Sequence, residues 1–258
     1  MARKSWVFAL ALVHLIAVAG TTQAQDGSTG SGQAGTYVGV FAGLGAVDVR
    51  MTDTDGFSGS EGVPGQTYGY DDTGIAAGVV AGRSFHLGRA KFRLEADGAF
   101  GGLPTASRQM DPIGLDETAE TELHWVGTAR VGVRKSLGRF DVFFTGGPSV
   151  AGISNSFTDL DPRTDGRERV DPDDSFDDRL TRLGWVAGTG IETPEASAWT
   201  LRFEGLYMDF GETGHQAENR AGVNTGVCGP SGLPSPCRYG IDQRFALLRL
   251  TLIRNFGR

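Results

Sequence analysis

Charged residues of both signs recur at every second position in several segments of this 258-residue chain. The spacing puts Arg93, Glu95 and Asp97 on one face of an extended strand, because successive strand side chains point to opposite sides. If that face is enclosed, its charges must pair, since an isolated buried charge is very costly. We therefore predict one interior ion-pair network, made of Arg93, Glu95, Asp97, Arg130, Arg134, Glu192, Arg202, Glu204 and Arg249.

Three histidines remain after residue 24, and they are the candidates for acid–base catalysis. We expect His86 in a tight turn and His215 in a mobile loop. We expect His124 to face inward, on the same side as Glu122. A general base needs a nucleophile or a water within hydrogen-bond reach. No serine-containing signature lies near His124 in the sequence, although a neighbouring strand could supply a serine. We predict no enzyme activity, no catalytic residue and no cofactor.

Two further groups have chemical potential. Cys228 and Cys237 are the only cysteines, and an even pair in a secreted chain indicates one disulfide, which would staple a binding loop or protect it from proteolysis. Segment 155–180 has nine acidic and four basic residues. Carboxylates could bind Ca²⁺, but no spacing matches a known calcium loop, so we predict a solvated loop and no metal site. The net charge of −7 argues against nucleic-acid binding.

The elements that must position these residues are strands. Stretches of about a dozen residues mix glycine, β-branched and aromatic residues in partial alternation, with charges on one face and apolar residues on the other. Leu123 and Trp125 are assigned to the apolar face, and Pro148 indicates a bulge or a strand end because proline cannot donate to the ladder. The eight predicted strands are 36–49, 73–85, 91–104, 121–135, 140–154, 181–192, 199–210 and 242–256.

The connections alternate strictly in length. Short periplasmic turns and long extracellular loops are typical of outer-membrane barrels, whereas a soluble sandwich has no reason to alternate them. All three tryptophans after residue 24, at 125, 185 and 199, fall on the predicted outer face, as interface aromatics do in such barrels. The tight connections are 86–90, 136–139 and 193–198, and the long, polar and acidic ones are about 50–72, 105–120, 155–180 and 211–241.

The N-terminal segment predicts secretion. Arg3 and Lys4 precede an apolar run over 6–19, and the small residues before 25 suit signal-peptidase cleavage after Ala24. A retained membrane anchor is the alternative, but the run is short for a span. The predicted organisation is a signal peptide over 1–24, a flexible leader over 25–35 and an outer-membrane β-barrel domain over 36–258.

The signal peptide, the eight strands, the alternating connections and the closing strand 243–256 resemble the small outer-membrane barrels of the OmpA, OmpX and opacity-protein kind. The resemblance covers nearly all of 36–256 and depends on pattern, with no sharp motif. It implies an eight-stranded antiparallel up-and-down transmembrane β-barrel in the bacterial outer membrane. Expected partners are outer-membrane lipids, lipopolysaccharide and the barrel-assembly machinery, which reads a terminal aromatic residue; here Phe256 is followed by two further residues.

The predicted function is structural and external. We expect a role in envelope integrity, adhesion or host contact, with an extracellular ligand or host surface meeting the acidic loops. A narrow diffusion pore is the main alternative. A lipid-modifying outer-membrane enzyme and a soluble periplasmic sandwich or ligand-binding barrel are less favoured.

Overall fold

A computed structural model gives the fold of the chain. Every regular element that it describes is a β-strand, and within this part of the chain no helix is long and apolar enough to span a membrane. The predicted signal peptide and nearly all of the leader lie outside the described residues. The described residues are 35–55, 64–87, 90–101, 103–109, 118–158, 160–162, 168–170, 175–194, 198–216 and 237–256.

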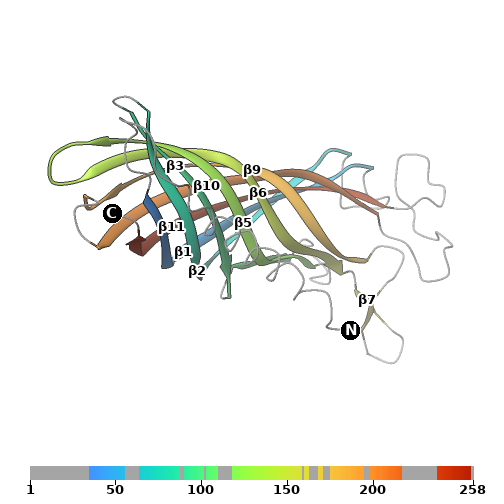
Figure 1. Cartoon of the computed structure of the whole chain (residues 1–258). Helices are drawn as coiled ribbons and strands as arrows, with labels where there is room; N and C mark the ends of the chain where they lie inside the picture. Colours follow the sequence, from blue (N-terminus) through green and yellow to red (C-terminus); the bar gives the residue numbers. More distant parts are fainter. Residues whose placement is uncertain are drawn as a thin grey trace.

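Eight long strands form a closed ring in which each strand is antiparallel to its neighbours (Figure 1). Pairing between β3 and β5 and between β1 and β11 closes the ring. Each of the eight strands is therefore hydrogen-bonded to a neighbour on both edges over at least part of its length. The predicted eight-stranded antiparallel barrel is confirmed. Its strands are β1 (Gly35–Asp53), β2 (Thr67–Leu87), β3 (Ala90–Phe100), β5 (Thr118–Ser136), β6 (Asp141–Thr158), β9 (Phe176–Glu192), β10 (Trp199–Gln216) and β11 (Arg238–Phe256).

Three short strands complete the sheet structure. β3 ends where Gly101 adopts a positive φ of 76°, and β4 (Thr105–Gln109) then continues the pairing along β5. β7 (Leu160–Pro162) and β8 (Glu168–Val170) pair with each other in the connection between β6 and β9. The predicted third strand, which ran to residue 104, therefore ends earlier, at Phe100.

The barrel has two unlike ends, which we call the turn end and the loop end. At the turn end, short connections join β2 to β3, β5 to β6 and β9 to β10. The β5–β6 turn contains Gly138 at a φ of 87°, and the Leu137 amide donates to the Phe140 carbonyl at 2.9 Å. This turn and the end of β11 lie at the left of Figure 1, whereas β7 lies at the other end.

Apart from β3, the strands of the ring are longer than predicted, and almost all of the extra length is at the loop end. Turn-end boundaries agree with the prediction within two residues, but β1 continues to 53 instead of 49 and β10 to 216 instead of 210. β2 begins at 67 instead of 73, and β9 at 176 instead of 181. A membrane-spanning strand needs about 9–11 residues, so strands of 17–21 residues have length to spare.

An apolar belt surrounds the turn-end part of the outer wall. Its side chains are large, hydrophobic and exposed, which is the pattern of a surface that faces lipid. Beyond this belt, toward the loop end, the outward side chains of β1 are Asp48 and Arg50, both more than half exposed. The belt comprises Val38, Val40, Leu44, Ile75, Val79, Leu94, Phe100, Val131, Val133, Phe144, Leu183, Trp185, Ile191, Trp199, Leu201, Phe203, Tyr207, Leu248, Leu250, Leu252 and Phe256.

Two irregularities differ from the prediction. The register of β5 against β6 shifts between Leu123 and Trp125, so that Leu123 is buried inside the barrel and not on the apolar outer face. Pro148, in contrast, causes no shift of register. The β5–β6 ladder only lacks its pairs between Thr128–Ser149 and Val131–Gly146, next to the residue that has no N–H to donate.

Candidate functional site

The turn-end half of the lumen contains a dense ion-pair network. The structure places all nine residues of the predicted network inside the barrel, each at most 8% exposed. Glu192, the last residue of β9, is one centre of the network. It accepts hydrogen bonds from Arg93 at 2.7 and 3.0 Å, from Arg134 at 2.8 Å and from Arg202 at 2.9 Å. One carboxylate thus holds guanidinium groups from three other strands.

A second centre lies closer to the loop end. Glu204 accepts from Arg130 at 2.7 Å and from Arg249 at 2.7 Å, and both arginines also contact Asp97, at 2.7 and 2.8 Å. These two acids and two arginines come from β3, β5, β10 and β11. Because these side chains come from strands on different sides of the ring, their ion pairs connect the wall across the lumen.

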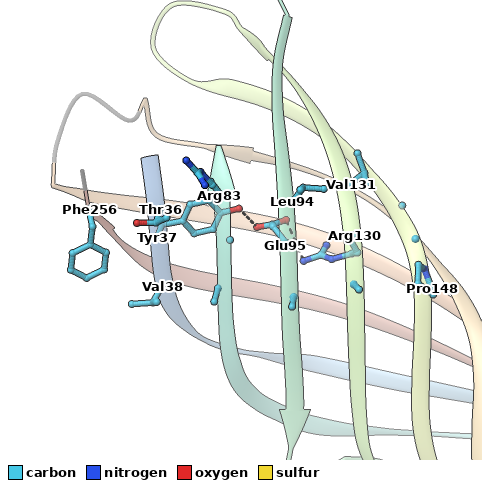
Figure 2. A pocket seen from close by; sticks show the side chains of 16 residues that line it. Thr36, Tyr37, Val38, Arg83, Leu94, Glu95, Arg130, Val131, Pro148 and Phe256 are labelled. Atoms are coloured by element: carbon cyan, nitrogen blue, oxygen red, sulfur yellow. Dashed lines mark hydrogen bonds and ion pairs between the residues drawn. The ribbon is translucent and has the colours of Figure 1, made fainter. Parts of the chain in front are cut away.

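Glu95 joins the two centres. Its carboxylate pairs with Arg202, lies 3.5 Å from Arg130 and 3.9 Å from Arg93, and accepts a 2.8 Å hydrogen bond from the Tyr37 hydroxyl. Figure 2 shows the Tyr37 hydroxyl directed at Glu95, with Arg130 approaching the same carboxylate from β5. The residues at the centre of the lumen therefore form one continuous network.

Two members of this network were not predicted from the sequence. Asp141 is 2% exposed and lies 3.5 Å from Arg134, and Tyr37 is 3% exposed. The predicted set has five arginines and four carboxylates, and Asp141 makes the charges equal. Two signals in the sequence could have identified Asp141. One was the unequal number of arginines and carboxylates, and the other was its position two residues before the inward Phe143, on the same face of the strand. We call these ten charged residues together with Tyr37 the charged layer.

Aromatic rings contact three of the guanidinium groups. Arg93 and Arg202 lie over the Phe143 ring, with the guanidinium carbon 4.3 and 5.2 Å from its centroid. Arg249 lies 4.2 Å from the centroid of Phe41. Cation–π contacts of this kind are favourable when desolvated, so the rings fill space between like charges and also attract them.

The loop-end half of the lumen is filled mainly by hydrophobic side chains. Phe157 packs against Phe176 and Tyr239, with ring centroids 6.2 and 5.0 Å away. We call this region the apolar layer. Its buried members include Val47, Val49, Met51, Tyr70, Leu123, Ile153, Phe157, Phe176, Met208, Phe210, Tyr239 and Ile241.

A chain of hydrogen-bonded polar side chains crosses the apolar layer. The Thr121 hydroxyl donates to Asn155 at 2.9 Å, and the Gln243 amide donates to the same oxygen at 2.6 Å. His215 lies 3.2 Å from the Asn155 amide nitrogen and 2.7 Å from Asp178. The prediction that His215 lies in a mobile loop is wrong: it belongs to β10 and is 4% exposed.

The wall itself differs between β9 and β10. Their ladder pairs run from Glu192–Arg202 to Trp185–Asp209. Beyond that point the Arg182 side chain links the two strands by donating to the carbonyls of Phe210 at 3.0 Å and Glu212 at 2.8 Å. We call this part of the wall the seam; here side-chain hydrogen bonds from Arg182 replace the backbone ladder.

The other predicted residues have different outcomes. His124 does not face the lumen: its ring contacts Glu122, whose side chain is 48% exposed on the outside of β5. Cys237 is described and buried, but Cys228 lies outside the described residues, so the disulfide stays a prediction. Among the described residues, no group of three or more histidine, cysteine and acidic side chains is placed to hold a metal ion.

Comparison with known proteins shows which proteins this barrel resembles. No protein-family model matches the chain. It is 32% identical over 142 residues to the 31 kDa outer-membrane immunogenic proteins of Brucella melitensis and Brucella suis, a match that covers 54% of this chain and 55% of each relative. The chain thus matches about half the length of these relatives.

A solved structure shares the fold. The outer membrane protein OprG from Pseudomonas aeruginosa superimposes with a TM-score of 0.51 at 13% identity, covering 88% of this chain and 98% of OprG. The chain is an outer-membrane β-barrel. Another similar structure, the outer membrane protease OmpT from Escherichia coli, has a TM-score of 0.46 at 7% identity, which is too low to bear on function.

The ends of this outer-membrane barrel can now be assigned. Short turns face the periplasm and long connections face outward in such barrels, so we infer that the turn end is periplasmic and the loop end extracellular. The apolar belt marks the membrane, and the charged layer lies at its level. The apolar layer lies where the wall continues above the outer leaflet.

Proposed function

We propose that this protein is a closed outer-membrane scaffold that presents its extracellular connections at the cell surface, with a role in envelope integrity, adhesion or host contact. The observation that carries the proposal is the double filling of the lumen. The charged layer joins strands across the ring within the membrane, and the apolar layer fills the ring above it. Eight strands leave room for little more than side chains, so such a barrel acts through its outer surfaces.

The length of the strands supports presentation at a distance from the lipid. On β1, residues 47–53 continue beyond the last apolar belt residue of that strand, Leu44. At about 3.3 Å per residue they add roughly 20 Å of wall. This extension would place the connections above the headgroups of lipopolysaccharide and other lipids, which we propose as the immediate partners of the wall. The barrel-assembly machinery would insert it.

The relatives and the charge pattern support the same role. The Brucella proteins are named for immunogenicity, which fits surface exposure of those proteins. In this chain the connection between β6 and β9 is rich in aspartate. We propose that an extracellular ligand or a host surface is met by these acidic segments.

Epitope tags test the presentation. A tag after Gly232, between β10 and β11, is expected to bind antibody on intact cells. A matched tag after Gly138, in the β5–β6 turn, is expected to bind only after the outer membrane is permeabilised. Antibody binding to the Gly138 tag on intact cells would reverse the proposed orientation.

Conductance tests the closure. Purified protein inserted in planar bilayers is expected to give no steady conductance steps, because five arginines and five carboxylates bridge the lumen. Regular steps at moderate voltage would contradict the closed scaffold and support the narrow diffusion pore. Insertion is verified independently by the mobility shift that barrels show when heated in SDS.

A further inference from the structure

A row of polar side chains crosses the outer face of three strands at the extracellular margin of the apolar belt. Glu122 of β5 is the register partner of Ser154 on β6, and Ser154 is in turn the partner of Arg179 on β9. All three point away from the lumen, because the residues that alternate with them, such as Leu123 and Ile153, are buried inside. This row is separate from both layers of the lumen.

His124, which lies at the β-bulge in β5, also belongs to this row. The register shifts between Leu123 and Trp125, so His124 has no partner residue on β6 in the ladder. Bulges re-aim side chains and occur next to active sites. Here the bulge leaves His124 on the outward side with Glu122 and Ser154 and shifts the alternation of the residues that follow it. In a regular strand, 122 and 124 would share a face but Val126 would face outward with them, and it is instead 3% exposed inside the barrel.

The resulting contacts have the geometry of an activated serine. His124 Nδ1 lies 3.1 Å from Glu122 Oε1, and His124 Nε2 lies 2.6 Å from Ser154 Oγ. The Glu122 carboxylate beside Nδ1 favours the tautomer with its hydrogen on Nδ1, which leaves Nε2 to accept the serine proton. An acid that orients a histidine which accepts from a hydroxyl is the arrangement used in nucleophilic hydrolysis, on many unrelated folds.

We propose that Ser154, His124 and Glu122 form a hydrolytic site on the outer wall, with Ser154 as nucleophile, and that its substrate is an ester-linked acyl chain of an outer-leaflet lipid. This proposal goes beyond the scaffold role and does not depend on it. It also reverses the prediction of no enzyme activity, in which His124 faced the lumen and no serine-containing signature lay near it in the sequence.

The position of the site points to lipid. Trp125 follows His124 directly, and its indole lies over Gly152, since a Cβ at 152 would be 2.2 Å from Trp125 Nε1. The exposed belt residues Phe100, the partner of Trp125, and Leu183 lie at the same margin. A carbonyl next to Ser154 would thus be at the boundary between apolar wall and water, where the ester bonds of membrane lipids lie.

The wall below the site has room for a chain. On the membrane side, the same two strands carry small outward residues, Ala129 and Gly146, which with Pro148 line part of an apolar hollow in the outer wall. Ala81 and Ala96 extend this hollow across β2 and β3. An acyl chain lying along the wall from Ser154 would meet this surface, whereas a water-soluble ester would not use it.

The reaction balances with water alone. Ser154 Oγ attacks the ester carbonyl while its proton passes to His124 Nε2. The carbon–oxygen bond to the alcohol breaks, and the histidine returns that proton to the leaving oxygen. Water then attacks the acyl-serine, its proton again passes through His124, and a free fatty acid is released with Ser154 restored.

Arg179 supplies positive charge beside the nucleophile. Its Nε donates to Ser154 Oγ at 3.2 Å, so its guanidinium lies beside the nucleophile, within reach of the carbonyl oxygen on which negative charge develops during attack. Fixed donors of this kind stabilise an oxyanion. We assign Arg179 to that role.

A lipid-like probe for nucleophilic serines provides the direct test. Purified protein in detergent micelles is treated with a long-chain alkyl fluorophosphonate, and the labelled peptide is identified by mass spectrometry. Label on Ser154 is expected, and it should be lost in Ser154→Ala and in His124→Gln. Ser156→Ala is the matched control, because Ser156 lies two residues along the same strand. Heat-dependent mobility verifies that each variant is folded.

Turnover identifies the source of the ester. Fatty-acid release is measured with p-nitrophenyl palmitate, with phosphatidylethanolamine vesicles and with purified lipopolysaccharide. Ser154→Ala is expected to lower hydrolysis of the cleaved substrate by about 10³-fold or more, and Glu122→Gln by about 10²-fold. Release from vesicles or from lipopolysaccharide tells the two lipid sources apart. Folded protein that neither takes the label at Ser154 nor cleaves any of the three substrates overturns the proposal and leaves the row as a structural tie between β5 and β6.

Discussion

The two layers fill the lumen with opposite kinds of side chain, charged in one and mainly hydrophobic in the other. At the level of the membrane, the outer wall is apolar and the interior carries ten charges. Above the membrane, the outer wall is charged and the interior is hydrophobic. β1 shows the change without any change of phase: its inward residues go from Tyr37 to Val49 and Met51, while its outward residues go from Val38 to Asp48.

This inversion teaches that surroundings, and not burial alone, decide which residues fill a barrel. Where lipid covers the outside, apolar residues are used on the wall, and a charged interior is tolerated because every charge is paired. Where water covers the outside, the barrel follows the rule of soluble proteins and hides its apolar side chains. One chain therefore contains an inside-out segment and an ordinary one, joined along continuous strands.

The largest effect is expected from breaking the charged layer. Glu204→Ala should lower the free energy of unfolding by about 4 kcal/mol, because Arg130 and Arg249 each lose a buried partner and removal of one member of a buried pair is strongly destabilising. Urea unfolding of the barrel in phospholipid vesicles measures this. Glu204→Gln retains the shape and one acceptor and should be less destabilising. A loss below 1 kcal/mol in the alanine variant would show that the network can rearrange around the gap.

The apolar layer should respond to lost volume and not to lost charge. Ile241→Ala removes a side chain that is fully buried in the loop-end half. The expected loss is about 3 kcal/mol, since the deletion leaves a cavity. Ile241→Val should cost only about 1 kcal/mol. If both variants were as stable as the wild type, the loop-end half would not be packed as a core, and the comparison between the layers would fail.

The membrane-level part of the barrel, with its charged interior, was predicted better from the sequence than the loop-end part, with its hydrophobic interior. Alternation of lipid-facing and charged residues revealed the nine network residues and the turn-end strand boundaries. It stopped at 49 and 210 because the outward residues there become polar, which looks like the start of a loop. The ladder in fact continues, so His215 was taken for a loop residue. Nothing in the local pattern indicates that the outer face of the same strand passes from lipid into water.

The outer-wall row could not be predicted for a different reason. Its members come from β5, β6 and β9 and meet only through strand register. The bulge at His124 reverses the phase of everything before it in β5, which put Leu123 on the wrong face. A one-residue shift of this kind has no signal in a single sequence, whereas its effect on side-chain direction is complete.

A smaller and local effect is expected at the seam between β9 and β10. Arg182→Gln removes the donors to the Phe210 and Glu212 carbonyls, each worth about 0.5–1.5 kcal/mol. Hydrogen exchange of amides in 210–216 should become faster, while amides in the charged layer should not change. Arg179→Gln, on the outward face of the same strand, is the matched control. Equal protection of 210–216 in both variants would mean that the seam is held by packing and not by Arg182.

The smallest effect is expected from a charge that is not enclosed. Asp48 lies on the same continuous β1 as the buried Tyr37, but its side chain is 59% exposed and its distance to Arg50 Nε is 3.9 Å. Asp48→Ala should change the free energy of unfolding by less than about 0.5 kcal/mol, because water and salt screen exposed pairs. The same urea experiment, repeated at low and at 1 M salt, compares it with Glu204→Ala. If the surface deletion cost as much as the buried one, the number of charges and not their enclosure would control stability, and the two layers would differ in composition only.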